Sequence, residues 1–221
     1  MYWPAMLLSA GEPLPADVLV HDYLTAEGRK ISKSSGAVVD PVALVERFGV
    51  DAVRWWLLRE VPRVGDADFT VARLAARYER DLANGLGNLV NRVVSMVHRY
   101  RGGTPGSYQE DAEPLVGAWR AAPGRVDAAL ADFDFRLATA AVWRVVEEAN
   151  RYVEEARPWQ LARTDEAALD RALGLLLAAC QAVGELLAPF LPEAAARITA
   201  QCTPVDGRLP EPRPLFPRLP A

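Results

Sequence analysis

Two lysines are the residues whose type and spacing point most directly to chemistry. Lys30 and Lys33 lie within the segment GRKISKSSG, residues 28–36, and every other basic residue among the 25 Lys and Arg is arginine. A general preference for arginine explains why lysine is scarce, but not why both lysines stand at one place. A loop of glycines and serines can move, and an ammonium group meets a phosphate as a compact point charge. The segment therefore predicts a phosphate-binding loop, and the alternative is a solvated basic loop.

Three polar side chains recur at intervals of four residues farther along the chain. At this spacing, Asn84, Asn88 and Arg92 fall on one stripe of a helix. Amide and guanidinium groups can bind the edges of unpaired bases and hold phosphates. The stripe is therefore a candidate RNA-binding face, and the alternative is the ordinary polar side of an amphipathic helix.

A proline followed by a tryptophan forms the third candidate site. Pro158 ends the preceding helical pattern, so the indole of Trp159 can project at the end of the helical bundle. An unstacked base lying on an aromatic ring gains about 1–3 kcal/mol. The alternative is that this tryptophan caps the hydrophobic core, which is the role we expect for Trp55, Trp56 and Trp143.

The elements that position these residues fall into two regions. In the first, the pattern predicts a helix over residues 2–11 and a short buried strand over 18–21, with a turn at 26–28. After the lysine loop, Asp40 and Pro41 predict a helix start, and two helices are expected over residues 42–48 and 51–60. This part is α/β material that ends in helices.

From about residue 69 the pattern is helical. Apolar residues at helical spacing predict one helix to the glycines at 102–106, a second over 126–156 with Leu130, Phe133 and Leu137 facing inward, and a third after 164–166. A last helix is expected to start at Pro192. A proline-rich tail over residues 204–221 is expected to have little to pack.

Composition limits the classes of function. The net charge is −4 and the pI about 5.3, so nucleic-acid contact must come from a local face of the protein. The two cysteines, Cys180 and Cys202, are too few for a disulfide scaffold or a Cys-rich zinc site, and we expect them in or beside a helical core. Acidic residues show no metal-ligand spacing, so no bound metal is expected. Charged residues interrupt each apolar run and no signal peptide is evident, which predicts a cytoplasmic protein without membrane contact.

Four segments together resemble one family. The sequence KISKS, residues 30–34, is similar to the second signature motif of class I aminoacyl-tRNA synthetases. The segments YWPA (2–5), VDAVR (50–54) and LANGLGN (82–88) resemble methionyl-tRNA synthetases more narrowly. The resemblance implies a mainly α fold: the C-terminal remnant of a Rossmann-like α/β catalytic domain over residues 1–67, a helical anticodon-binding bundle over 68–203, and a tail over 204–221.

The same resemblance implies roles for the candidate residues. Lys30 and Lys33 would be catalytic and would bind the phosphates of ATP while charge grows on them, with Ser32 and Ser34 as further donors. A second set would bind the anticodon of methionine tRNA; its members are Asn84, Asn88, Arg92, Pro158 and Trp159. ATP, with Mg²⁺, is the implied substrate, and DNA is not an expected partner. Asp51, Arg54 and residues 66–69 would have a positional role between the two regions.

This sequence departs from the family pattern in three ways. Ile31 replaces a methionine and Ala37 replaces an asparagine in the lysine loop. The chain has two histidines, His21 and His98, and neither belongs to the His-x-Gly-His element of class I enzymes. We therefore expect a C-terminal portion that is inactive alone, with the other half of the site supplied by a longer reading frame or a separate chain. The alternatives are a stand-alone tRNA-binding module and a decayed duplicate.

Overall fold

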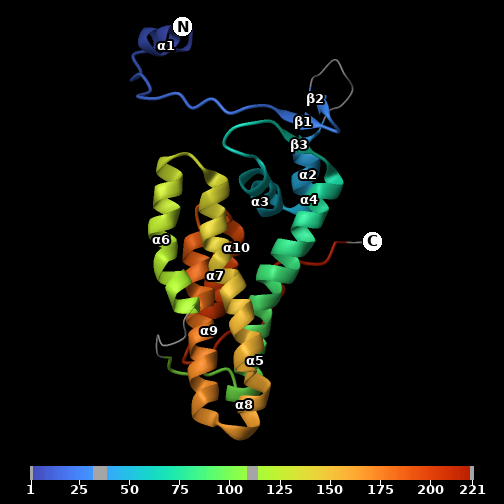
Figure 1. Ribbon diagram of the computed structural model, residues 1–221, viewed down its shortest axis with the longest axis vertical. Coiled ribbons are helices and arrows are strands. Elements are labelled where there is room, and N and C mark those ends of the chain that lie inside the picture. Colours follow the sequence, from blue (N-terminus) through green and yellow to red (C-terminus); the bar gives the residue numbers. More distant parts are fainter. Residues whose placement is uncertain (1, 32–38, 109–113, 220–221) are drawn as a thin grey trace.

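The computed structural model describes residues 2–31, 39–108 and 114–219, and it places a small sheet at one end of a helical bundle (Figure 1). The sheet has three strands, β1 (Leu24–Ala26), β2 (Arg29–Lys30) and β3 (Ala67–Phe69), in the order β2-β1-β3. β1 pairs with β2 in antiparallel and with β3 in parallel orientation. The predicted boundary at 67/68 falls within β3, and the division into domains stays a prediction.

Two short helices connect this sheet to the bundle, as the sequence predicted. Helix α2 (Pro41–Phe48) begins where the Asp40 carboxylate accepts a hydrogen bond from the Val42 N–H at 2.9 Å, and Pro41 occupies the first turn. Gly49, with φ of 83°, ends α2 and precedes α3 (Val50–Glu60). The left-handed φ favours glycine here, because a side chain would be strained in it.

The prediction of a buried strand over residues 18–21 is wrong. Val18 is 75% exposed and Val20 is 83% exposed, and the described residues contain no strand that pairs with them. An apolar segment forms a strand only where a neighbour takes up its backbone N–H and C=O groups. The helix predicted over residues 2–11 is present as α1 (Tyr2–Ser9), although none of its residues is buried.

One long helical rod carries the polar stripe. It consists of α4 (Val71–Arg77), a π-helix, η1 (Tyr78–Gly87), and α5 (Asn88–Arg101), and it ends at Gly102 with φ of 59°. The rod runs beside the bundle from the sheet toward its far end (Figure 1). Its existence was predicted, but the π-helical middle was not.

The single helix expected over residues 126–156 is wrong, because a turn divides it. Helix α6 (Leu115–Ala131) and helix α7 (Phe135–Ala156) pack against each other as a hairpin. At the turn, Phe133 has φ of 56°, and the Asp134 carboxylate caps α7 by accepting the Leu137 N–H at 2.8 Å. Phe133 and Leu137, expected to face inward, are 46% and 58% exposed.

Three further helices complete the bundle: α8 (Pro158–Thr164), α9 (Glu166–Leu187) and α10 (Pro192–Cys202). By length and composition α9 could cross a membrane, contrary to the expectation that no run would qualify, but 72% of its most apolar window is buried in the protein. That burial identifies it as a core helix. Cys180 and Cys202 are buried in the core, as expected, and so are Trp55, Trp56 and Trp143.

The C-terminal segment does pack, contrary to the expectation for residues 204–221. Leu209, Leu215 and Phe216 are buried, and the Phe216 ring meets that of Tyr78 edge to face with centroids 5.9 Å apart. The Tyr78 hydroxyl donates to the Pro217 carbonyl at 2.6 Å. The segment thus returns to the rod and covers part of the core.

Candidate nucleic-acid interface

The lysine loop leaves the sheet at β2. Lys30 is the last residue of β2, where its backbone is paired with Thr25, while Ser32, Lys33 and Ser34 lie outside the described residues. At the base of the loop, one carboxylate oxygen of Asp68 accepts from the Gly28 N–H and from the Thr25 hydroxyl, each at 2.7 Å. These bonds, the Gly28 bond first, lower the pKa of Asp68, because they favour the ionised form. Asp68 therefore fixes the turn from which the loop departs.

The polar stripe lies on the rod as predicted, and one of its three residues, Arg92, forms an ion pair within the protein. Asn84 in η1 and Asn88 in α5 are exposed. The Arg92 side chain is 31% exposed, and its guanidinium donates to a Glu154 carboxylate oxygen on α7 at 2.7 Å. Because Glu154 is itself 63% exposed, this ion pair is at the surface, where such pairs are weak. A phosphate can therefore compete for Arg92.

Trp159 is placed by an abrupt change of direction between two helices. Arg157 adopts a left-handed conformation, with φ of 47°, and is both the C-cap of α7 and the N-cap of α8. Pro158 follows in the first turn of α8 and is buried, whereas Trp159 is 37% exposed. A non-glycine residue in this conformation is strained by roughly 1–2 kcal/mol. This strain accompanies the sharp turn that places the Trp159 indole at the end of the bundle.

Trp159 lines an open groove of about 780 Å³. The groove is formed by the end of α5, the end of α7 and the whole of α8 beyond its proline; its lining residues are Arg99, Tyr100, Glu155, Ala156, Arg157 and residues 159–164. Three of these side chains, Arg99, Arg157 and Arg163, are exposed arginines. The groove thus combines an accessible aromatic ring with cationic donors, which is the composition of single-stranded nucleic-acid sites.

All three arginines that line the groove were missed from the sequence. Arg99 follows Arg92 by seven residues, so it continues the same helix face, and this spacing was a usable signal. Arg157 and Arg163 join the groove only because α8, which packs on α9, shares the groove with the end of α5, and no local pattern predicts this. The groove lining does not include Asn84, Asn88 or Arg92. They lie farther up the rod, and Arg92 approaches the groove through its bond to Glu154, the neighbour of the lining residue Glu155.

Asp51 and Arg54 connect the two regions, in keeping with their predicted positional role. Asp51 accepts the Ala194 N–H at 2.6 Å in the first turn of α10, and Arg54 donates to the carbonyls of Phe190 and Pro189 at 2.7 and 2.8 Å. Burial raises the pKa of Asp51 from its ordinary value, although the Ala194 bond opposes the shift. Both side chains are committed to the packing of α3 against the start of α10.

Metal binding finds no support in the part of the chain that the structure describes. There, no group of three or more His, Cys, Asp or Glu side chains is arranged to hold an ion.

Two family models match successive parts of the chain. Residues 1–94 match the class I tRNA synthetase model labelled (M), and residues 103–215 match the anticodon binding domain of methionyl tRNA ligase. The methionine–tRNA ligase of Caldanaerobacter subterraneus subsp. tengcongensis is 42% identical over 195 residues, which are 86% of this chain and 31% of that protein. That of Brucella suis is 37% identical over 99% of this chain and 46% of its own length.

Solved structures agree with the sequence comparisons. The crystal structure of Mycobacterium tuberculosis methionyl-tRNA synthetase bound by methionyl-adenylate is 34% identical, with a TM-score of 0.85 over 98% of this chain and 47% of that one. The chain thus spans about a third to a half of the length of the relatives that it matches.

Proposed function

Because this chain belongs to the methionyl-tRNA ligase (synthetase) family, we propose that it binds methionine tRNA by its anticodon loop. The observation that carries the proposal is the position of Trp159, part-exposed in a groove that also presents Arg99, Arg157 and Arg163. An anticodon loop offers unstacked bases and closely spaced phosphates, and the groove offers a stacking surface and guanidinium donors for both.

Each predicted residue has a distinct task in this proposal. A base stacks on Trp159, which Pro158 and the strained Arg157 hold in position. Asn84 and Asn88 offer amides to base edges, and Arg92 exchanges its bond with Glu154 for one with the RNA. Amides that donate and accept together can distinguish one base from another, whereas the arginines supply affinity that is independent of sequence.

For the lysine loop we propose the family's role in ATP binding. Lys30, Ser32, Lys33 and Ser34 would meet the triphosphate of ATP, which with Mg²⁺ is a substrate of the complete, cytoplasmic enzyme, and the two lysines would stabilise charge that grows in the transition state. Asp68 supports this role, because it fixes the Gly28 turn from which the loop departs.

We further propose that charging of tRNA with methionine requires more polypeptide than these 221 residues, in a longer chain or as a separate chain. Helix α1 supports this, because Tyr2, Trp3, Met6 and Leu8 are all more than 60% exposed. Such an apolar helix needs a partner surface. The chain alone should then show no methionine-dependent exchange of pyrophosphate into ATP, and sustained exchange would contradict this requirement.

The test of the anticodon proposal is RNA binding by the whole chain, followed by fluorescence anisotropy. We expect the Trp159→Ala variant to bind methionine tRNA about five- to a hundredfold more weakly, since one stacked base contributes about 1–3 kcal/mol. A tRNA with a changed anticodon should bind the unaltered chain weakly as well. The matched control is Trp3→Ala, which removes an indole that is 75% exposed on α1, at the other end of the molecule (Figure 1). Equal affinity for both tRNAs would refute anticodon recognition.

A further inference from the structure

A second cationic site lies at the opposite end of α7 from the groove. It is a cavity of about 390 Å³ between α3, α4 and the start of α7, lined by Arg59, Arg77, Asp134, Arg136, Leu137 and Ala140. Three guanidinium groups from three different helices thus face one space with a single carboxylate among them. Repulsion within such a cluster of like charges opposes folding unless anions offset it.

The charges at this cavity are only partly balanced. Arg77 forms ion pairs with Glu60 and with Asp81, the latter at 3.1 Å. Asp134 is occupied as the cap of α7, where it accepts the Leu137 N–H. Within the described ranges, neither Arg59 nor Arg136 takes part in an ion pair. Arg136 is exposed and Arg59 is half-buried, and among the described residues neither has a carboxylate in direct contact, although Asp81 and Glu147 attract Arg59 from farther away.

Burial and neighbouring charge act together on Arg59. Burial lowers the pKa of Arg59 from its ordinary value, and the positive charges of Arg77 and Arg136 lower it further, while Asp81 and Glu147 oppose the shift. The Cζ atom of Arg59 lies over the Trp55 ring, 5.8 Å from its centroid, and this cation–π contact holds the side chain without neutralising its charge. An anion between Arg59 and Arg136 would relieve this repulsion. The start of α7 adds to the attraction, because the N-terminal end of a helix is positive.

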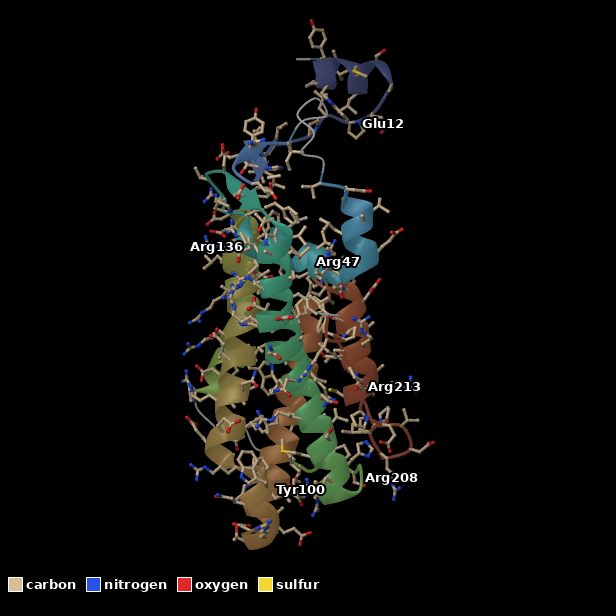
Figure 2. All side chains as sticks on the ribbon, turned by 90° about the vertical axis from the view of Figure 1, so that its right-hand side faces the viewer. Glu12, Arg47, Tyr100, Arg136, Arg208 and Arg213 are labelled. Atoms are coloured by element: carbon tan, nitrogen blue, oxygen red, sulfur yellow. The ribbon has the colours of Figure 1, made fainter. Side chains whose placement is uncertain are left out.

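The position of the cavity relative to the groove suggests its ligand. Arg136 is near the start of α7 and Arg157 is at its end, so the rise per residue of an α-helix places the two sites roughly 30 Å apart. Figure 2 shows this separation, with Arg136 near the sheet end and Tyr100, a groove residue, at the far end. Both sites border α7 and the rod that α4, η1 and α5 form. A double-stranded RNA stem leaving the groove would carry a continuous row of phosphates over such a distance.

We propose that the cavity of Arg59, Arg77 and Arg136 binds a backbone phosphate of the RNA whose loop occupies the groove. The proposal rests on the function proposed above and adds to it a second, sequence-independent point of contact. Guanidinium groups suit this ligand, because their planar fork binds two phosphate oxygens at once. A phosphate contact fixes how an RNA lies on the protein but does not distinguish bases.

The test uses the whole chain with Arg136→Gln, which removes an exposed charge and leaves the cap at Asp134 intact. We expect this variant to bind full-length methionine tRNA about tenfold more weakly, because one charge-assisted bond is lost. The slope of log affinity against log salt should fall by about one. The ratio of affinities for tRNAs with the native and a changed anticodon should stay the same. Arg136→Lys should recover part of the affinity, since it restores the charge.

The matched control is Arg208→Gln, which removes an exposed arginine from the opposite edge of the molecule (Figure 2) and should change none of these quantities. A minimal hairpin that carries only the anticodon loop on a short stem should bind Arg136→Gln and the unaltered chain equally. Unchanged affinity and salt slope for Arg136→Gln, with Trp159→Ala still impaired, would overturn the phosphate site alone. Absence of RNA binding by the unaltered chain would overturn both proposals.

Discussion

Asp51 is the residue through which pH should act on the joint between α3 and α10. Asp51 is 3% exposed; one oxygen of its carboxylate accepts the Ala194 N–H, and the other has no hydrogen-bond partner. Because burial raises its pKa above the ordinary value of 3.8, the folded protein binds this proton more tightly than the unfolded chain does. The contribution of Asp51 to the free energy of unfolding is therefore most favourable below the unfolded pKa. It declines as the pH rises through the folded pKa.

This sign leads to a prediction for two substitutions at Asp51. Asp51→Asn keeps an acceptor for the Ala194 N–H and removes the ionisation, so its stability relative to the parent should improve between pH 4 and pH 7. Asp51→Ala removes the acceptor and should lower the free energy of unfolding at pH 7 by about 1–2 kcal/mol. Urea denaturation at the two pH values measures both effects. A relative stability of Asp51→Asn that is independent of pH would show that burial does not control this carboxyl group.

At the residue scale, sequence found those functional candidates that are close together along the chain. The lysine pair, the stripe of Asn84, Asn88 and Arg92, and the Pro158–Trp159 step are all local patterns. Arg59, Arg77 and Arg136 could not be grouped from sequence, because they are far apart in the chain and meet only through the packing of α3, α4 and α7. Separation along the chain, and not residue type, therefore limited which site residues could be grouped from the sequence.

At the scale of elements, two glycines allow a loop to lie directly on helix α9. A Cβ at Gly174 would lie 2.7 Å from the Ser107 carbonyl oxygen and 2.8 Å from that of Gly106. A Cβ at Gly106 would in turn overlap the Asp170 carbonyl oxygen. The loop after α5 thus packs backbone against backbone on α9, which only glycine permits.

We predict opposite effects for two Gly→Ala substitutions in helices. Gly174→Ala should lower the free energy of unfolding by about 1–3 kcal/mol, because the loop backbone must move away. Gly124→Ala, at an exposed position of α6 with no atom within 4 Å of its added Cβ, should raise it by about 0.5–1 kcal/mol through helix propensity. Thermal unfolding of both variants compares them directly. A stabilised Gly174→Ala would mean that the loop does not contact α9 in this way.

Element boundaries were predictable where a capping residue marks them. Asp40, Pro41, Gly49 and Pro192 were read correctly, because cap chemistry is local. The turn between α6 and α7 was missed, since apolar residues keep a helical period through it and Asp134 was not recognised as a cap. The π-helix of η1 was also missed. Within it, Leu86 is buried and Gly85 lies against the Trp143 ring, and no composition rule marks such a segment as π-helical.

At the scale of the whole molecule, the C-terminal segment closes the bundle against the rod. Besides the Phe216 and Tyr78 contact, the Leu209 N–H donates to the Gly103 carbonyl at 2.9 Å, and the Arg213 N–H donates to the Gln201 side chain at 2.8 Å. The segment thus contacts the rod, the loop after it and α10. It contributes to the stability of the bundle although it has no regular secondary structure.

The prediction at this scale concerns Phe216. Phe216→Ala should lower the free energy of unfolding by about 3 kcal/mol, since it removes a ring that is 9% exposed and leaves a cavity beside Tyr78. Val205→Ala is the control in the same segment, because Val205 is 63% exposed and should change stability by less than about 0.5 kcal/mol. Guanidinium denaturation compares the two. Equal, small effects would show that the segment does not pack in solution.

The overall plan, a sheet remnant followed by a helical bundle, was predictable because family resemblance and helical period agree over most of the chain. The packing of residues 204–219 was not, since proline-rich composition is typical of unpacked tails and gives no sign of tertiary partners. The prediction of a strand over residues 18–21 is wrong because composition also gives no sign of whether a neighbouring strand is present. A strand is defined by its neighbours as much as by its own residues.

The π-helix η1 determines how the two ends of the rod are rotated relative to each other. Each residue of an α-helix advances the chain by about 100° around the axis, whereas the wider π turns advance it by less. Ten residues of η1 separate Arg77 at the cavity from Asn88 at the start of α5, so they determine the rotational phase between the two ends of the rod. Loss or gain of one residue there would turn Asn88 and Arg92 around the axis relative to Arg77. The cavity at Arg77 and the polar stripe would each remain intact, but they would no longer face the same RNA molecule.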